Sequence, residues 1–431
     1  MNRDDLEKLS KGELVEAYLL LQAKLHRPAK TSRTSSKPPS TDRKEKREQS
    51  KPGGAQPGHE GHHRSLAAAP DRIIDHRPDL CPGCGTAIGA DAAGEVIGEY
   101  DRIDIPVISP EVERHRRLSC TCPGCGAAVK APVPTAACGS PFGPNISSLA
   151  FYLRHIQHVS YQRLEALFAD VFGLTISQGA LGNIFRRGGA YFSARKADIL
   201  ARLRQAEAVA SDETGVRIEG TNAYQWVFRS RDAVLHEMAF SRGAQVVRDV
   251  MGGHRPTFWT SDRYSAQQGH GERHQTCLAH LARDAARVLE IGCERTGLAL
   301  KLWFRDAFVL ARGVGSLAAS TVARKVRDLD KRIGGILARR TGCTETDAVL
   351  QKIANARDQL LTFAAAPPGL VDPTNNGCER DLRPAVVGRK ITNGFRAAWA
   401  ADVDAHVRSV IDTEELYAIT PFQAIRQTLQ A

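Results

Sequence analysis

Three acidic residues stand in sequence contexts that suit metal-dependent chemistry. Asp212 and Asp262 each lie where an apolar, strand-like run ends, and Glu379 opens a polar stretch rich in arginine. Carboxylate oxygens are preferred ligands of Mg²⁺, and three carboxylates on a pair of cations can support in-line displacement at a phosphate. We therefore predict that Asp212, Asp262 and Glu379 are catalytic residues that bind Mg²⁺ or Mn²⁺ for phosphoryl transfer.

Neighbouring acids compete with this assignment. Glu213 adjoins Asp212, but successive residues of a strand face opposite sides of a sheet, so only one of the two can point into the site. Asp372 and Asp381 are alternatives to Glu379. An isolated Asp after a strand is also a common turn former, which is the structural alternative for each position.

Two near-identical cysteine turns point to a second metal. Cys81-Pro-Gly-Cys84-Gly and Cys122-Pro-Gly-Cys125-Gly have the spacing of zinc knuckles. Ten cysteines in 431 residues are too few for a disulfide scaffold, and the charged N-terminus is not typical of a secretory signal. We predict a zinc site with four thiolate ligands at these positions. Redox activity is the alternative, although no thioredoxin-like pattern surrounds the pairs.

Residues 144–187 have the pattern of a helix-turn-helix. Gly173 is placed to end one helix and Ser177 to cap the next, which is predicted over 178–187. Such a helix can lie in the major groove of DNA, although many helical hairpins of this form bind nothing. The predicted DNA contacts here are Gln178, Asn183, Arg186 and Arg187.

A second group of basic residues surrounds Glu379 and indicates a helix lying along a phosphate backbone. A solvated basic face is the alternative. These residues are Arg380, Arg383, Arg389 and Lys390.

The sequence pattern predicts that the elements holding the three carboxylates form a mixed α/β core. Three consecutive strands joined by short turns, with a hairpin turn at 220–222, are followed by a helix and a further strand, a pattern typical of a ribonuclease-H-like sheet. Asp212 then lies on the first strand and Asp262 at the carboxyl end of the adjacent fourth strand. The predicted ranges are 208–218, 224–230 and 234–240 for the first strands, 243–251 for the helix and 257–260 for the fourth strand.

The whole chain is predicted to be a multidomain α/β and α protein. Its predicted parts are an N-terminal coiled-coil-like helix (1–27), a basic disordered linker (28–70), a small zinc-binding domain (71–138), a helix-turn-helix region (139–200), a ribonuclease-H-like core (201–400) with a helical insertion at about 276–366, and C-terminal helices (401–431). The zinc-binding part is expected to contain strand-like stretches at 100–108 and 112–118. Leu14, Tyr18, Leu21 and Leu25 form a short apolar seam, which suits dimerisation or packing within the chain equally well.

The charge of the chain favours an acidic partner. The net charge is +11, and residues 24–64 alone hold 11 basic and 4 acidic side chains, a contribution of +7. Such a segment can bind nucleic acid by neutralising phosphates, or can serve only as a solvated linker. No apolar run reaches the roughly 18 residues of a membrane span, so the chain is expected in the cytosol.

These motifs, in this order, resemble the insertion-sequence-66 family of transposases over nearly the full chain. The resemblance implies a DDE core with Asp212, Asp262 and Glu379 as its carboxylates, a zinc-binding domain and an N-terminal DNA-binding region. It also implies action in the bacterial cytoplasm, at the nucleoid, on the terminal inverted repeats of a mobile element, with a homo-oligomer on DNA and accessory proteins as partners. The matching segments are 35–40, 54–59, the two cysteine turns, 142–144, 172–177, 212–214, 261–264, 277–280 and 375–380.

Two other functions stay open on the sequence alone. A catalytically inactive DNA-binding protein derived from a transposase would keep the same scaffold. A metal-dependent nuclease would use the same carboxylates to cut DNA without joining it.

Overall fold

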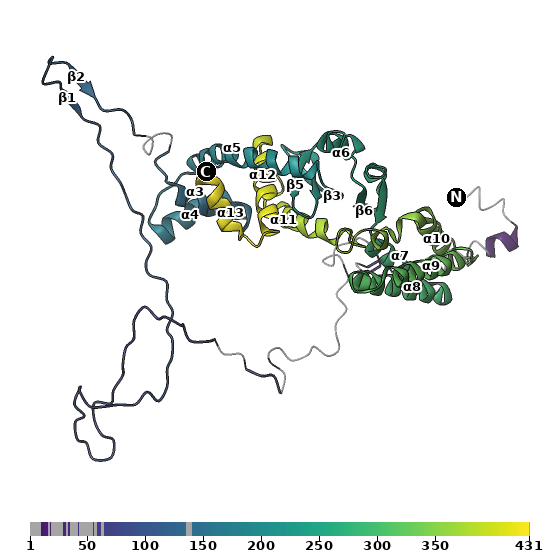
Figure 1. The fold of residues 1–431 in the computed structure, drawn as a ribbon, viewed down its shortest axis with the longest axis horizontal. Helices are drawn as coiled ribbons and strands as arrows, with labels where there is room; N and C mark the ends of the chain where they lie inside the picture. The colour runs from purple at the N-terminus through teal and green to yellow at the C-terminus, as the bar shows by residue number, and fades with distance from the viewer. Residues whose placement is uncertain are drawn as a thin grey trace. The chain divides into compact units, whose positions relative to one another are not determined.

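The computed structural model describes residues 10–15, 18, 29–31, 33–34, 42, 55, 58–61, 64–134 and 140–430. They form two units, residues 1–43 with 112–431 and residues 44–111. The first unit is a mixed α/β fold built around a five-stranded sheet (Figure 1). Its strands, in the spatial order β5-β4-β3-β6-β7, are β5 (Val234–Ala239), β4 (Thr221–Arg229), β3 (Ala208–Ile218), β6 (Phe258–Ser261) and β7 (Arg273–Thr276).

The sheet combines an antiparallel meander with a parallel half. Strands β3, β4 and β5 pair antiparallel, whereas β6 runs parallel to β3 and β7 runs parallel to β6. The four predicted strands are confirmed within two or three residues at each end. The turn between β3 and β4 is Glu219-Gly220 rather than 220–222, because positive φ at both residues (51° and 78°) gives a two-residue hairpin.

Alternation along β3 assigns its side chains to two layers. Val209 packs in the apolar cluster that includes helix α6 (Ala244–Met251), and the Ser211 hydroxyl contacts Gln267 in the short helix η3 (Ser265–Gln267). Ala210 packs instead against Cys378 of helix α11 (Asn376–Thr392). Residues at even positions of β3, Asp212 among them, therefore face α11.

The edge of β5 is closed by a helix. The N–H groups of Val234 and His236 donate to the hydroxyls of Thr413 and Ser409, at 2.9 and 2.8 Å. Both hydroxyls belong to α12 (Ala398–Glu415), and α13 (Pro421–Gln430) follows it. Side chains of α12 thus accept hydrogen bonds from backbone N–H groups of β5 that would otherwise be unpaired at the edge of the sheet.

A run of three helices precedes the sheet: α3 (Pro144–His155), α4 (Tyr161–Phe172) and α5 (Gln178–Leu203). The predicted caps are confirmed, since Gly173 has φ 62° and the Ser177 hydroxyl accepts from the Ala180 N–H. The expected end of the last helix at 187 is wrong, because α5 continues to Leu203 and packs against α12.

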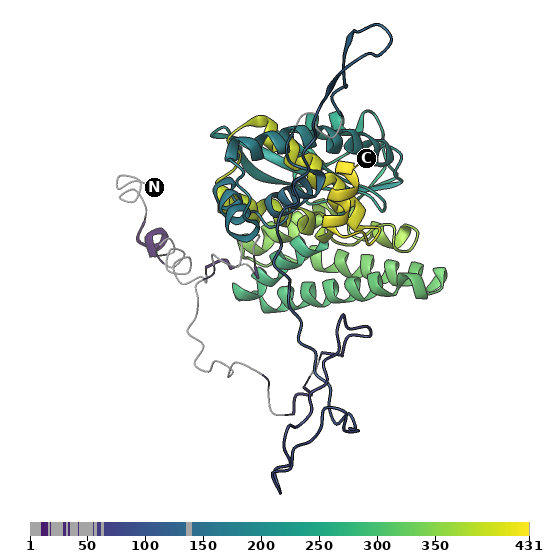
Figure 2. The ribbon, with the colours of Figure 1, turned by 90° about the vertical axis from the view of Figure 1, so that its left-hand side faces the viewer.

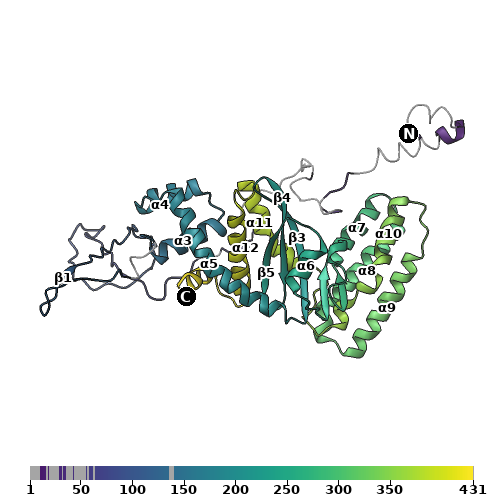
Figure 3. The same cartoon turned by 90° about the horizontal axis from the view of Figure 1, so that it is seen from above.

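The expected insertion is helical and lies on the opposite side of the sheet from α3, α4 and α5 (Figures 1 and 3). Its four longer helices lie side by side (Figure 2). They share an apolar core that contains Trp303, Leu329 and Ile353. They are α7 (Leu278–Glu290), α8 (Glu294–Gly313), α9 (Ala319–Leu337) and α10 (Thr344–Asn355). Strand β7, which immediately precedes α7, has the polar sequence Arg-His-Gln-Thr and was missing from the sequence-based prediction.

The segments between the two cysteine turns are irregular. The strand-like stretches expected at 100–108 and 112–118 form no strand, because alternation produces a strand only where a partner strand pairs with it. Tyr100 and Val107 are 94% and 97% exposed. One short hairpin does form around the second turn, from β1 (Ser119–Thr121) and β2 (Ala128–Lys130).

At the N-terminus, residues 11–15 are helical, and the Ser10 and Glu13 side chains form a capping box. Two residues of the predicted apolar seam, Leu21 and Leu25, lie outside the described residues. Among the helices that the structure describes, none combines the length and the apolar character that a membrane crossing needs.

Candidate active site

The register of the sheet brings Asp212 and Asp262 to the same level. In the parallel pairing of β3 with β6, residue 208 lies opposite 258, 209 opposite 259 and 210 opposite 260. Each step keeps an offset of 50 residues, which is also the separation of Asp212 from Asp262. The Asp262 carboxylate accepts the Tyr264 N–H at 2.8 Å, and that of Asp212 accepts the Glu213 N–H at 3.0 Å. The carboxyl ends of adjacent strands thus place both acids at one edge.

The charges of the predicted trio are close enough to affect one another. Burial raises the pKa of Asp212 well above its usual range, and the carboxylates of Glu213, Asp262 and Glu379 raise it further. Four acids converge here, and ionising them all is unfavourable unless positive charge is supplied.

Helix α11 carries Glu379 in its first turn, and Asn375 immediately before the helix fixes its start. The buried Asn375 side chain donates to the Ser211 carbonyl oxygen at 2.8 Å, and its backbone N–H lies 3.2 Å from the Cys277 sulfur. The Glu379 N–H in turn donates to the Asn375 carbonyl oxygen at 3.1 Å. One residue therefore connects the helix that holds Glu379 to the strand that holds Asp212.

The alternatives to Glu379 have other positions. Asp381 accepts two hydrogen bonds from Arg229, at 2.7 and 2.9 Å, which fasten α11 to β4. Asp372 is exposed before the helix begins. Glu379 is half-buried, and its carboxylate lies 3.7 and 3.8 Å from the side chains of His280 and Arg283.

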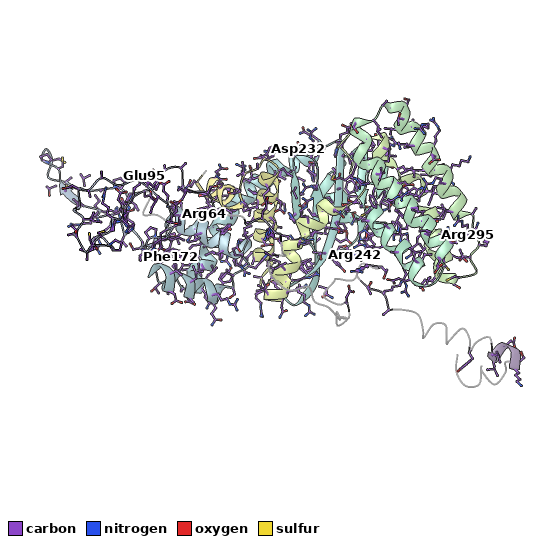
Figure 4. The ribbon with its side chains drawn as sticks, turned by 90° about the horizontal axis from the view of Figure 1, so that it is seen from below. Arg64, Glu95, Phe172, Asp232, Arg242 and Arg295 are labelled. Carbon is purple, nitrogen blue, oxygen red and sulfur yellow. The ribbon has the colours of Figure 1, made fainter. Side chains whose placement is uncertain are left out.

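Glu213 faces the other side of β3, as alternation predicts, yet it remains close to the site. Its carboxylate is 2% exposed, forms an ion pair with Arg242 at 2.6 Å and contacts the Gln267 amide. Arg242 also lies over the Tyr264 ring, 4.0 Å from its centroid. Figure 4 shows Arg242 beside the sheet on the side of the helical insertion.

The donor set suits hard divalent cations. In the part of the chain that the structure describes, the one cluster of three His, Cys, Asp or Glu ligand atoms lying within 4.8 Å of one another is Cys277, His280 and Glu379. Asp212 and Asp262 are not part of that cluster. A bound cation would favour the ionised form of Asp212, whose pKa is raised first by burial and then by the neighbouring carboxylates.

Sequence reasoning missed two basic groups of the insertion that flank Glu379. His280 Nε2 and a terminal nitrogen of Arg283 lie 3.7 and 3.8 Å from Glu379 Oε1. Burial lowers the pKa of His280, and Arg283 lowers it further. The Cys-Leu-Ala-His sequence at 277–280 is the signal that could have identified this position.

The two cysteine turns have the same local geometry. In each turn the first Cys N–H and carbonyl oxygen form hydrogen bonds of 2.8 to 2.9 Å across the turn, and the glycine after the second Cys has positive φ, 73° at Gly85 and 74° at Gly126. Hydrogen bonding to Thr86 lowers the pKa of Cys84, and backbone N–H groups lower that of Cys122. Each turn therefore favours thiolates, the form that binds metal.

The predicted DNA-contact residues have mixed surroundings. Asn183, Arg187, Arg380, Arg383 and Lys390 are exposed. The Gln178 amide donates to Glu165 at 3.0 Å, and the Arg186 guanidinium lies 4.6 Å from the centre of the Trp399 ring. Arg389 donates to the Thr214 hydroxyl at 3.0 Å and to the Gly215 carbonyl oxygen, so it fastens α11 to β3.

Comparison with known protein families gives two matches. Residues 139–403, more than half of the chain, match the family described as "Transposase IS66 family". Residues 78–126 match the "zinc-finger binding domain of transposase IS66". No curated protein matches the chain.

Proposed function

This chain belongs to the IS66 family of transposases, and we propose that it cleaves DNA strands at the terminal inverted repeats of a bacterial insertion sequence and joins them to a target. The observation that carries the proposal is the register of β3 and β6, which brings Asp212 and Asp262 to one edge of the sheet, with Glu379 near enough for its charge to act on Asp212. Burial raises the pKa of Asp212, and the carboxylates of Glu213, Asp262 and Glu379 raise it further. Strand cleavage and strand transfer are both phosphoryl transfers, and one carboxylate site can perform both.

We further propose that the five-stranded sheet is a ribonuclease-H-like core. Its strand order, with an antiparallel meander on one side of β3 and two parallel strands on the other, supports this proposal. The helices α7 to α10 are then an insertion between β7 and α11.

In this proposal Asp212, Asp262 and Glu379 would hold two divalent cations, Mg²⁺ or Mn²⁺. When bound, such cations act as Lewis acids on a phosphate and lower the pKa of an attacking water or hydroxyl. Asn375 orients Glu379, and Arg242 neutralises Glu213 so that this nearby acid does not compete as a ligand. The buried strand ends hold the two aspartates in a fixed register.

The test of the proposal is strand cleavage of DNA that carries the inverted repeats flanking this reading frame. Purified full-length protein with Mg²⁺ or Mn²⁺ should nick the repeat ends, and Asp212→Ala should lose the activity by a factor of at least about 10³. The exposed Asp372→Asn is a matched control and should retain it. If the wild type and Asp212→Ala yield identical products, the enzymatic proposal fails.

For the zinc-finger region we propose that Cys81, Cys84, Cys122 and Cys125 are zinc ligands. The local geometry of the two turns and their lowered thiol pKa values support this assignment. Zinc content measured on full-length protein should fall by one equivalent in Cys81→Ser and in Cys122→Ser. Cys120→Ser, two residues before the second turn, should keep its zinc, and an unchanged zinc content in all three variants would remove the site.

The DNA partner is proposed to meet three basic regions of a homo-oligomer. They are the arm at 24–64, the exposed residues Asn183 and Arg187 of α5 with Gln178 and Arg186, and the exposed face of α11 with Arg380, Arg383 and Lys390. Phosphate contacts of this kind position DNA without reading its sequence.

A further inference from the structure

Two basic side chains of the insertion face the third carboxylate of the candidate active site. His280 and Arg283 are three residues apart on α7 and therefore share one face of the helix. They lie 3.7 and 3.8 Å from Glu379 Oε1. Both distances exceed those of hydrogen bonds, so Glu379 has two donors beside it without being bound by either.

Both side chains keep polar atoms without a partner. Among the described residues, His280 Nδ1 and Arg283 Nε are buried and form no hydrogen bond. Buried donors and acceptors are nearly always paired in folded proteins, and an unpaired one points to a missing ligand. By contrast, the buried Arg287 on the same helix is bonded to Glu290 and Glu345, at 3.2 and 3.1 Å.

The helix that carries these side chains is held at its start by contacts within the protein. The Leu278 N–H donates to the Pro373 carbonyl oxygen at 2.9 Å, and the Asn375 N–H lies 3.2 Å from the Cys277 sulfur. The first turn of α7 is thus fastened to the segment that leads into α11. Preorganised donors at a reacting group need little rearrangement, which is how enzymes stabilise developing charge.

We propose that His280 and Arg283 form a phosphate subsite that binds the non-bridging oxygens of the DNA phosphodiester at which Glu379 acts. This inference rests on the proposed function and identifies how the anionic substrate is accepted next to three carboxylates. The guanidinium provides a planar set of donors that fits two phosphate oxygens, and an imidazole carries at least one N–H in either protonation state.

A soft metal ion is the competing ligand for this position. Cys277, His280 and Glu379 have ligand atoms within 4.8 Å of one another, a set that Zn²⁺ could use. The phosphate is favoured because the Cys277 sulfur is fully buried and already bonded to the Asn375 N–H. A zinc ion would also leave Arg283 Nε without a partner.

The experiment measures binding and cleavage of inverted-repeat DNA by full-length His280→Ala, Arg283→Ala and Arg283→Lys. Arg295→Ala is the matched control, since Arg295 is an exposed arginine of the same helical insertion (Figure 4). Binding is measured with Ca²⁺ in place of Mg²⁺ over a range of salt concentrations. Arg283→Ala should reduce the slope of log affinity against log salt by about one, the value of a single phosphate contact. Arg295→Ala should leave the slope unchanged.

Cleavage in Mg²⁺ provides the second readout. Arg283→Ala should slow cleavage about 10²-fold at saturating DNA, as expected for loss of one preorganised donor, and His280→Ala by about tenfold or more. Arg283→Lys should keep the salt slope yet remain slower than the wild type, because lysine lacks the planar donor pair. If the melting curve of Arg283→Ala shows that this variant is unfolded, Arg283→Lys still tests the subsite.

Three outcomes are distinguishable. If Arg283→Ala and His280→Ala cleave and bind as Arg295→Ala does, the phosphate subsite is wrong. If both His280→Ala and Cys277→Ser lose one equivalent of bound Zn²⁺ while the salt slope is unchanged, the position is a metal site instead. If the wild type itself does not cleave, the proposed function fails, whereas the salt slope still decides whether Arg283 contacts a phosphate.

Discussion

At the scale of single residues, the candidate site is defined by which carboxylates are already neutralised. Glu213 is paired with Arg242, and Asp381 is paired with Arg229. Among the described residues, no cation is paired with Asp212, and its pKa is raised by burial and by neighbouring acids. This contrast is consistent with the proposed role of Asp212 as a metal ligand and with structural roles for Glu213 and Asp381.

The raised pKa of Asp212 makes a prediction about stability. Its pKa is higher in the folded chain than the usual 3.8, so the folded state holds the proton more tightly. Stability is consequently lost as the pH rises from the unfolded pKa through the folded pKa, and the loss is complete above it. Asp212→Asn removes this penalty. Its melting temperature should rise by a few degrees at about pH 8, the effect of roughly 1 kcal/mol, and change little at about pH 4.

Asp372→Asn provides the control for this measurement, because Asp372 is exposed and should melt like the wild type at both pH values. A gain in Asp212→Asn that is equal at both pH values, or a loss near pH 8, would contradict the electrostatic account.

Among the secondary-structure elements, helix α11 determines where Glu379 lies, through its contacts with the sheet. Three contacts do this: the Asn375 amide to the Ser211 carbonyl oxygen, Arg229 to Asp381, and Arg389 to Thr214. Because these contacts are spread along α11, they fix the rotation of the helix about its axis and its position along β3. Glu379 reaches the level of Asp212 as a result.

Asn375→Ala tests this fastening. Loss of the buried amide leaves the Ser211 carbonyl oxygen without its donor, which should cost about 1–3 kcal/mol of unfolding free energy in a urea titration. Cleavage should fall more than stability alone explains, because Glu379 loses its position. The exposed neighbour Asn376→Ala should change both quantities little. An Asn375→Ala variant that is destabilised yet cleaves at the wild-type rate would show that this contact does not position the site.

Helix α5 provides a second test, because close packing against its adjacent glycines Gly188 and Gly189 accompanies its continuation past them. A Cβ at Gly189 would lie 2.5 Å from a Val403 methyl group of α12, whereas a Cβ at Gly182 would meet nothing nearer than 3.9 Å. Gly189→Ala should destabilise the protein by about 1–3 kcal/mol through overpacking. Gly182→Ala should stabilise it by about 0.5–1 kcal/mol through helix propensity. Equal effects of the two changes in thermal unfolding would rule out the close contact of α5 with α12.

Much of this arrangement could be predicted from the sequence, and the failures have physical causes. The strands β3 to β6 were predictable because apolar alternation and short turns are local signals. Strand β7 was missed because its polar residues are satisfied by tertiary contacts, for example Gln275 with Leu360 and Phe363. The extension of α5 was missed because Gly188 and Gly189 suggest a break, and only their close approach to Phe151 and Val403 explains them.

The site itself was predictable only in part. Asp212, Asp262 and Glu379 were named from the ends of strand-like runs and an arginine-rich stretch. Their partners Asn375, Arg242 and Arg283 were not, because each acts across a contact between distant segments that no local pattern records.

In the molecule as a whole, several separate parts of the chain have features that suit a protein acting on DNA. A net charge of +11 and a basic arm favour a polyanion, and the two cysteine turns lie within the zinc-finger match. The transposase family match covers the helices α3 to α5, the sheet and the insertion together. These features all agree with the proposed action on DNA.

Cleavage of inverted-repeat DNA by Asp262→Cys, measured in Mg²⁺ and in Mn²⁺, tests most directly whether Asp262 binds a catalytic cation. A thiolate is a poor ligand for the hard Mg²⁺ ion and a better one for a transition metal. If Asp262 binds a catalytic cation, the variant should be inactive in Mg²⁺ and regain measurable cleavage in Mn²⁺, while Asp372→Cys behaves as the wild type in both. Cleavage by Asp262→Cys at the wild-type rate in Mg²⁺ would contradict the claim.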